Sequence, residues 1–392
     1  MQRSRGLLMN WFAQRFELSR GGSQDNIRPM EGLRGFAVFL VFLVHYVSLV
    51  EPWVAKESIT WVISHAMHTI GNSGVDLFFV LSGYLIYGSL MDRQQPFLRF
   101  MSRRIERIYP AFLVVLLLYL MLSFAFPSES KLPSTFAAGS VYLIQNMLLL
   151  PGIFPIEPII TVAWSLSYEM LYYLAIPGVI MLLNLHHRRA VWRTTFFLVV
   201  TLATTIYCAL NGGHMRLVMF IAGILLFEST RATALSTPSS PLALLLLVAG
   251  LLTLLLPLGG SVGNAFKVLV LFFAFFTTCL TCFKNPSGGL AQAFTWTPLR
   301  WLGNISYSYY LIHGLALKSA FLILASVLPS AVLGPWFFWL LLPIAFLMTL
   351  PPSAALYLLV ERPLSIKPPN PSLIVSHHSA DDPSPIVRGH ET

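Results

Sequence analysis

Charged residues are scarce in this chain of 392 residues: only 10% are Asp, Glu, Lys or Arg, against roughly 25% in average soluble domains. So few charges cannot cover the surface of a soluble protein of this size, because 56% of the residues are hydrophobic and the mean hydropathy is +0.71. The composition also excludes a disordered or a fibrous chain. We therefore predict an all-α, polytopic membrane helix bundle.

Cysteine is nearly absent, with only Cys208, Cys279 and Cys282, and each lies inside an apolar run. Three such residues exclude a disulfide framework. Cys279 and Cys282 form a single CxxC without a second pair of ligands, which does not meet the ligand count of a structural zinc site. We predict no metal site and no bound cofactor.

Acidic residues are also few, 16 against 25 Lys and Arg, so the net charge is +9. A basic balance can indicate nucleic-acid binding, but here the arrangement of the charges along the chain favours a membrane partner. A helix needs about 20 residues to cross a bilayer. Apolar runs near that length predict ten spans, at 34–51, 73–91, 108–126, 162–183, 194–210, 215–228, 241–257, 266–283, 303–327 and 336–360.

Lys and Arg orient these ten spans, since cytoplasmic loops of membrane proteins carry an excess of both. With both termini in the cytoplasm, 20 of the 25 basic residues lie inside, and the outside holds only Lys56, Lys131, Arg216 and Lys267. A further apolar run, 135–150, would reverse the later loops if it crossed, so we predict that it does not. The positive charge then faces the lipid bilayer, and we predict no nucleic-acid partner.

Three regions follow from this reading. Residues 1–28 hold five arginines and no secretory signal pattern, which predicts a cytoplasmic arm, such as an amphipathic helix on the bilayer surface. Residues 29–363 form the ten-helix transmembrane domain. Residues 364–392, rich in Pro and Ser, predict a disordered cytoplasmic tail.

Ionisable residues within the spans are candidates for function because burying them in lipid is costly. They are Asp76, Glu169, His45, His313 and Lys318. Arg34 and His45 are eleven residues apart, which places them about 20° apart on one helix face and about 16 Å apart along it. Arg34 is then expected at the cytoplasmic end of its span and His45 near the midplane.

Polar residues recur at helical spacing in two spans, which predicts inward faces around a water-filled or substrate-filled cavity. In one span they are Ser165, Glu169 and Tyr172, followed by Tyr173; in the other, Ser306, Tyr309 and His313. We expect the substrate to contact Trp164, Ser165, Tyr172, Tyr309 and His313.

A group of arginines lies before the third span: Arg99, Arg103, Arg104 and Arg107. Arg side chains match phosphate geometry, so these predict a site for a phosphorylated donor. Topology alone, or anionic lipid, also explains such a cluster. Likewise His313 and His45 are compatible with interhelical hydrogen bonding, Glu169 with a structural contact and Asp76 with interfacial solvation. Ser82 lacks the surrounding elbow of a nucleophile and is read as a packing position.

Six motifs in order resemble the acyltransferase-3 family of membrane carbohydrate O-acyltransferases. They are the Arg-x10-His pattern of Arg34 and His45, GVDLFFVLSG at 74–83, RRIERIYP at 103–110, WSLSYE at 164–169, LGNISYSYYLIH at 302–313 and ERP at 361–363. The resemblance implies an acyl-CoA donor, most often acetyl-CoA, a carbohydrate hydroxyl as acceptor and a bacterial inner-membrane location. It implies Arg34 and His45 as the essential pair, with supporting positions at Asp76, Arg103, Arg104, Arg107, Glu169, Glu361 and Arg362.

The resulting hypothesis is an acyl transfer across the membrane. Acyl-CoA phosphates bind Arg99, Arg103, Arg104 and Arg107, while Arg34 positions the donor. His45 acts as the general base on the acceptor hydroxyl, oriented by Asp76 or Glu169. Two alternatives use the same features: a carrier or flippase for a glycan or lipid-linked sugar, and a non-catalytic receptor.

Overall fold

The computed structural model describes residues 13–17, 27–233, 236–328 and 334–366, and the regular structure in these ranges is helical apart from one isolated bridge. This confirms the predicted all-α membrane class. The longer helices are α2 (Ile27–Val50), α4 (Ser73–Asp92), α5 (Phe97–Ala125), α7 (Trp164–Leu182), α8 (Ala190–Asn211), α11 (Gly260–Lys284), α14 (Ser306–Val327) and α15 (Pro335–Leu356). The shorter ones are α3 (Ile59–Gly71), α6 (Phe136–Met147), α9 (Val218–Arg231), α10 (Ser240–Thr253), α12 (Gly289–Phe294), α13 (Thr297–Asn304) and α16 (Arg362–Ser365).

Every one of the ten expected spans coincides with a helix. Among the described residues, eight helical segments are long and apolar enough to cross a membrane. The sixth and seventh expected spans, α9 and α10, have 14 residues each and rise only about 21 Å, less than the ~30 Å hydrocarbon core. The run at 135–150 forms the 12-residue α6, which is too short to cross.

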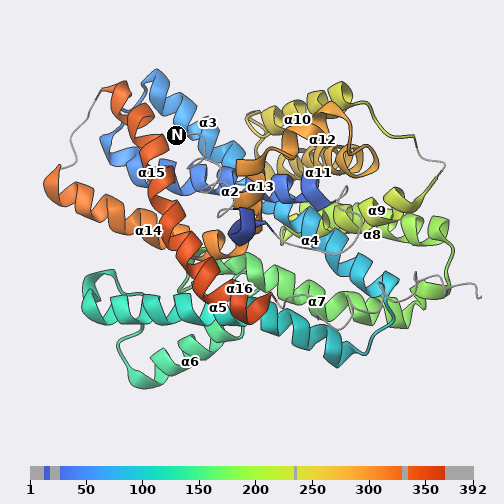
Figure 1. The fold of residues 1–392 in the computed structure, drawn as a ribbon, viewed down its shortest axis with the longest axis horizontal. Helices are drawn as coiled ribbons and strands as arrows, with labels where there is room; N and C mark the ends of the chain where they lie inside the picture. Colours follow the sequence, from blue (N-terminus) through green and yellow to red (C-terminus); the bar gives the residue numbers. More distant parts are fainter. Residues whose placement is uncertain (1–12, 18–26, 234–235, 329–333, 367–392) are drawn as a thin grey trace, which may run out of the picture.

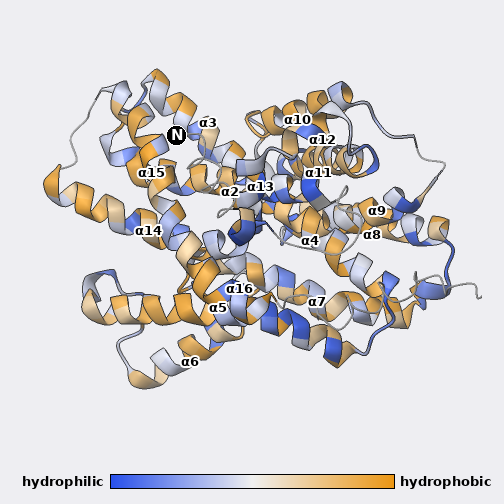
Figure 2. Cartoon of the chain, viewed as in Figure 1, coloured by the Kyte–Doolittle hydropathy of each residue, from blue (hydrophilic) through white to orange (hydrophobic). Residues whose placement is uncertain are grey.

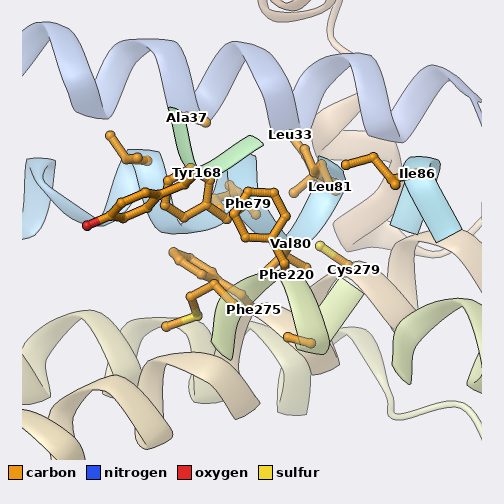
Figure 3. Packing of buried hydrophobic residues seen from close by; sticks show 14 of the residues in the cluster. Leu33, Ala37, Phe79, Val80, Leu81, Ile86, Tyr168, Phe220, Phe275 and Cys279 are labelled. Atoms are coloured by element: carbon orange, nitrogen blue, oxygen red, sulfur yellow. The ribbon is translucent and has the colours of Figure 1, made fainter. Parts of the chain in front are cut away.

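The packing centre of the bundle contains α2, α4 and α9 (Figure 1). Figure 3 shows Phe79 of α4 and Phe220 of α9 in contact, and their rings stack with centroids 4.5 Å apart. Gly83 and Gly223 allow these two backbones to meet: a Cβ on Gly83 would stand 2.1 Å from the Phe220 carbonyl oxygen. Close contact of small residues is a general way for membrane helices to associate.

Hydrophobic side chains cover the outside of the bundle. Leu117, Met121 and Phe124 of α5 and Ile323 of α14 are all more than half exposed, as expected of side chains that face lipid. Figure 2 shows hydrophobic residues along α5, α10 and α14, with hydrophilic residues at turns such as the one between α4 and α5.

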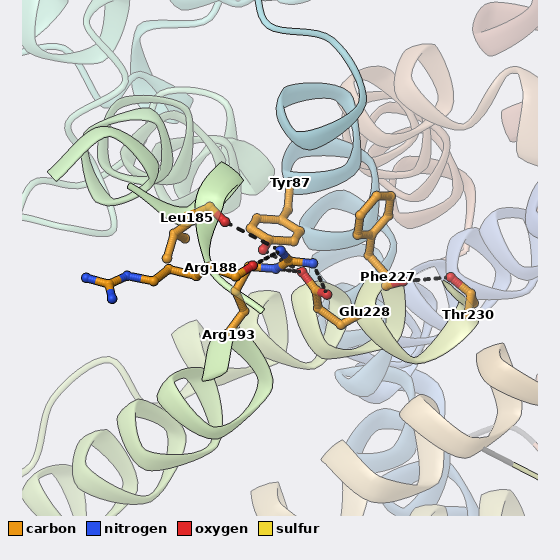
Figure 4. Close-up of polar contacts among 7 residues, drawn as sticks. All are labelled: Tyr87, Leu185, Arg188, Arg193, Phe227, Glu228 and Thr230. Atoms are coloured by element: carbon orange, nitrogen blue, oxygen red, sulfur yellow. Dashed lines mark hydrogen bonds and ion pairs between the residues drawn. The ribbon is translucent and has the colours of Figure 1, made fainter. Parts of the chain in front are cut away.

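A buried ion pair holds α8 against α9. Arg193 donates from Nε and Nη2 to the two carboxylate oxygens of Glu228, at 2.6 and 2.7 Å, and Tyr87 of α4 donates to the same carboxylate at 2.6 Å (Figure 4). Because the pair is bidentate and has a third donor, it meets the conditions under which a buried charge is well compensated.

The described part of the N-terminal arm, residues 13–17, contacts the helical domain. Arg300 of α13 pairs with Glu31 of α2 at 3.0 Å and with Glu17 of the arm at 2.9 Å. Asn304 donates to the Phe16 carbonyl oxygen at 2.9 Å, and the Phe16 ring is buried. The rest of the arm and residues 367–392 of the expected tail lie outside the described residues, and the expected domain boundaries stay predictions.

Candidate functional site

Two contacts join α2 to α14 and bring predicted site residues together. Arg34 donates from Nε and Nη2 to Ser306 Oγ, at 3.1 and 2.8 Å. Further along both helices, the His45 and His313 rings meet edge to face with centroids 4.9 Å apart. Arg34 and His45 therefore face the same neighbouring helix, as their eleven-residue spacing predicts.

His313 is fully buried, and its ring has one defined hydrogen-bonding arrangement. Nδ1 lies 2.9 and 3.0 Å from the carbonyl oxygens of Tyr309 and Tyr310. A carbonyl oxygen only accepts, so Nδ1 carries a proton. In the neutral ring Nε2 then holds a lone pair, and this buried atom has no hydrogen-bond partner among the described residues. Tyr309 stacks on the imidazole at 5.0 Å and receives a hydrogen bond from Thr349.

Arg34 lines a narrow cavity of about 70 Å³ enclosed by α2, α4, α5, α7 and α14; we call it the Arg34 cavity. Its polar lining residues are Arg34, Ser82, Arg107, Ser165, Glu169, Tyr173, Ser306, Tyr307 and Tyr310. Tyr310 connects this cavity to the histidine pair, since its ring lies 6.2 Å from that of His313. An arginine pair, a carboxylate and several hydroxyls thus converge on the Arg34 cavity, and Tyr310 in its wall is one helix turn from His313.

Glu169 is held in the Arg34 cavity by its neighbours. Its Oε1 accepts a short hydrogen bond from Tyr173 and a longer one, at 3.4 Å, from Ser82 of α4. Tyr173 is one turn along α7 from Glu169, which matches the predicted polar stripe. The carboxylate therefore has defined donors, and its place between α4 and α7 agrees with an inward-facing residue.

The four arginines of α5 divide into two pairs. Arg99 and Arg103 are exposed, whereas Arg104 and Arg107 are half-buried. Arg104 donates to Ser89 Oγ at 3.1 Å and lies over the ring of Tyr173 at 5.2 Å. Arg107 faces the Arg34 cavity. Arg99 and Arg103 therefore stand outside the cavity that Arg107 lines.

Asp76 lies in the wall of a second cavity and does not line the Arg34 cavity. It lines a wider cavity of about 680 Å³, which we call the Asp76 cavity, and its partner is Arg216, with Oδ1 3.5 Å from Nε. The structure therefore joins Asp76 to the α8–α9 connection, and the ring contact of His45 is made by His313. Neither Asp76 nor Glu169 has a described hydrogen bond to His45.

The remaining residues that we expected to contact the substrate differ in their position relative to the two cavities. Ser165 Oγ is 2.7 Å from the Tyr310 hydroxyl on the wall of the Arg34 cavity. Tyr172 points away from that cavity, because its hydroxyl donates to the Leu217 carbonyl and its ring stacks on Phe220. Trp164 lies beside the Asp76 cavity, with the Arg216 guanidinium 5.7 Å from its ring.

Other polar residues of these cavities were missed by sequence reasoning. Tyr310 directly follows Tyr309 of the predicted polar face, so the sequence already indicated a polar residue at this position. Arg216 was counted only as an outside charge. Glu361, implied by the family motif, lies in a π-helical turn (Tyr357–Glu361) and accepts from Ser308 N at 3.1 Å and from its Oγ at 2.5 Å. Within the described ranges, no group of three His, Cys, Asp or Glu could hold a metal ion.

The chain is similar in sequence to several proteins named as acyltransferases. The chain is 33% identical over 154 residues to acyltransferase MdmB of Streptomyces mycarofaciens, 38% of each protein. It is 23% identical over 324 residues to peptidoglycan O-acetyltransferase OatA of Listeria monocytogenes, 74% of this chain and 49% of that protein. It is 28% identical over 207 residues to O-acetyltransferase OatA of Staphylococcus aureus, half of this chain and 30% of the relative. These matches thus span less than half of each relative's length.

No solved structure matches the chain significantly. The model of the acyltransferase-3 family, described as an acyltransferase domain, matches residues 28–358. That range contains Arg34, His45, Asp76, Glu169, His313 and the α5 arginines, and the chain belongs to the acyltransferase-3 family.

Proposed function

We propose that this multi-pass membrane acyltransferase moves an acyl group, in the first instance acetyl, from acyl-CoA to a carbohydrate hydroxyl at a bacterial inner membrane. One observation carries the proposal: Arg34 and Arg107 converge with Glu169 on a single cavity, and the histidine pair lies beyond Tyr310 along the same helices. The names of the relatives, two of them O-acetyltransferases, support the acetyl group.

The donor enters from the cytoplasmic side in this proposal. Its phosphates bind the α5 arginines, with the exposed Arg99 and Arg103 outermost and Arg104 and Arg107 deeper. Guanidinium groups suit phosphates because they bind them with two parallel hydrogen bonds. Arg34, whose guanidinium is held by Ser306, directs the thioester toward the histidines.

His45 takes the proton from the acceptor hydroxyl as its oxygen attacks the thioester carbon. The new C–O ester bond forms, the C–S bond breaks, and the departing CoA thiolate receives the proton from the imidazolium. A positioned general base contributes roughly 10²–10⁴-fold to such a step. In this proposal His313, whose Nε2 lone pair has no described partner and whose ring contacts that of His45, accepts a hydrogen bond from His45 and so orients it. This replaces the expected orienting role of Asp76 or Glu169.

The test is mass spectrometry of surface glycans and secreted glycosides from cells with wild-type protein or the His45→Ala variant. We expect one acetyl mass to disappear from a glycan fraction in the variant, with equal protein in the membrane. The matched control is His65→Ala, because His65 is an exposed histidine of α3 whose hydrogen bonds, within the described residues, stay inside its own helix. Unchanged acylation in His45→Ala would overturn the proposal. Glycans that are mislocalised but unchanged in mass would favour the carrier reading.

A further inference from the structure

The Asp76 cavity is a wide cavity with many polar lining residues, and the donor proposal does not use it. Its volume of about 680 Å³ lies within the roughly 300–1,000 Å³ typical of small-molecule sites. Its polar lining residues are Thr69, Asn72, Ser73, Asp76, Tyr168, His214, Arg216, Ser261, Asn264 and Lys267. Hydrogen-bonding side chains in this number, beside apolar ones such as Met215 and Leu254, suit a polyhydroxylated ligand.

The position of the cavity follows from the short helix α9. The inner end of α9 is fixed by Glu228, and 14 residues rise about 21 Å of a ~30 Å core. Under the predicted topology the other end of α9, with Arg216 just before it, therefore stops roughly 9 Å below the outer edge of the hydrocarbon core. The Asp76 cavity lies at this recessed end, which opens it to the extracytoplasmic side.

The cavity also lies next to the candidate catalytic residues. Asp76 and Ser82 are on the same helix, six residues or about 9 Å apart, and Ser82 lines the Arg34 cavity. On α7, Tyr168 faces one cavity and the following Glu169 faces the other. A molecule in the Asp76 cavity and a donor in the Arg34 cavity would thus approach the same part of α4 and α7 from opposite sides.

Asp76 is buried and incompletely satisfied. The residue is only 4% exposed, and Oδ1 has no hydrogen-bond partner among the described residues, since Arg216 Nε is 3.5 Å away. Arg216 is kept at this distance while it also lies over the Trp164 ring. A carboxylate in the wall of a polar cavity, with hydrogen-bonding capacity left over, is suited to accept a hydroxyl hydrogen from a ligand.

Two cations face the same space. The Arg216 side chain is 32% exposed and its only described ion pair is the loose one to Asp76. Lys267, in the second turn of α11, forms no ion pair within the described part of the chain. With one carboxylate against Arg216 and Lys267, the cavity carries a net positive charge. Two cationic side chains on the wall of one polar cavity suit an anionic ligand, because hydrogen bonds between charged groups are stronger than those between neutral ones.

We propose that the Asp76 cavity binds the acceptor, and that this acceptor is an acidic carbohydrate bearing a carboxylate or phosphate. Lys267 and Arg216 bind the anionic group, and the Asp76 carboxylate accepts a hydrogen bond from a sugar hydroxyl. The acceptor role rests on the proposed acyl transfer; the charge selectivity rests on the residues of the cavity alone.

The experiment measures binding by calorimetry to the full chain purified in neutral detergent, without acyl donor. The probes are trigalacturonate, its fully methyl-esterified form and glycerol 1-phosphate, the last as a lipid-headgroup mimic. We expect trigalacturonate to bind at least about tenfold more tightly than the ester, which is the usual size of one charged hydrogen bond. Lys267→Gln should remove this preference, whereas Asp76→Asn should weaken the acid and the ester alike.

Lys131→Gln is the control, since Lys131 is an outer lysine already paired with Glu157. Acyl-CoA binding should persist in every variant, which shows that the bundle is folded. Equal binding of acid and ester, no binding of either, or an unchanged preference in Lys267→Gln would overturn the proposal. Stronger binding of glycerol 1-phosphate than of trigalacturonate would assign the cavity to a lipid headgroup instead. Failure of acyl transfer with retained trigalacturonate binding would count against the proposed function only.

Discussion

Two ion pairs lie at opposite ends of α9 and differ in the number and length of their hydrogen bonds. At one end Arg193 and Glu228 share two hydrogen bonds of 2.6 and 2.7 Å, with side chains 14% and 2% exposed. At the other end Arg216 and Asp76 are 3.5 Å apart, and Oδ1 is left without a hydrogen bond in the described structure. A closed pair stabilises the bundle, whereas a loose pair beside a cavity keeps hydrogen-bonding capacity for a ligand.

The largest effect is expected from breaking the closed pair. Glu228→Ala leaves the Arg193 guanidinium and the Tyr87 hydroxyl without their shared acceptor. Removing one member of a buried pair costs about 3–5 kcal/mol, so the variant should unfold well below the wild-type temperature or fail to accumulate. Thermal unfolding of the purified protein in detergent measures this.

The control for that prediction is Asp92→Ala, which breaks an exposed pair with Arg231 near the same end of α9. Exposed pairs contribute about 0–1 kcal/mol, so its unfolding temperature should stay close to that of the wild type. Similar losses in both variants would mean that burial does not separate the two pairs.

A substitution in the loose Asp76–Arg216 pair should lower activity and not stability, the reverse of the result expected for the closed pair. Asp76→Asn removes a buried charge but keeps the size and an amide oxygen, while the part-exposed Arg216 retains solvent and the Trp164 ring. We expect an unfolding temperature equal to or above the wild type and acyl transfer at least about tenfold slower, because sites built for a ligand are rarely optimal for stability. Steady-state transfer rates and thermal unfolding are measured on the same preparation. A strong loss of stability would make Asp76 a structural residue.

Part of this comparison could be predicted from the sequence. Each of the ten apolar runs falls on a helix, although only eight helical segments in the described ranges are long and apolar enough to cross a membrane. The eleven-residue spacing placed Arg34 and His45 on one face, because helix periodicity is a local property. The partner of Asp76 could not be predicted in the same way. Arg216 is 140 residues further along the chain, and which helices become neighbours depends on packing such as the Gly83–Phe220 contact.

The same reason explains why the four α5 arginines looked equivalent. The spacing of these arginines along α5 does not show which of them face the interior of the bundle. That depends on the packing of α7, where Tyr173 lies against Arg104 and helps to enclose the cavity that Arg107 lines. The shortness of α9, by contrast, was visible in the sequence, since the expected span 215–228 has only 14 residues and ends in Glu228; the structure places the α-helix three residues later, at Val218–Arg231, after a short preceding turn.

A smaller effect, on the KM for acyl-CoA, should distinguish the half-buried Arg107 from the exposed Arg103. Arg107→Gln removes a guanidinium from the Arg34 cavity, whereas Arg103→Gln alters an exposed side chain one turn earlier. If the cavity holds the donor, Arg107→Gln should raise the KM for acyl-CoA about tenfold, the size of one charge-assisted hydrogen bond. Arg103→Gln should change it by less than about threefold, as exposed ion pairs are weak. Equal effects would place the donor phosphates on the exposed surface of α5.

The smallest effect is expected at Ser82, which stands on α4 between the two cavities. Its hydroxyl donates to Glu169 at 3.4 Å, and Tyr173 already supplies that carboxylate with a closer donor. Interhelical hydrogen bonds in membrane proteins average only about 0.6 kcal/mol, so Ser82→Ala should lower transfer by less than about threefold. Acetylation rates and the mass of the intact protein during turnover measure this together. A loss of several hundredfold, or an acetyl adduct on Ser82 in the wild type, would make Ser82 a nucleophile, and would move the chemistry from the histidine pair to the boundary between the two cavities.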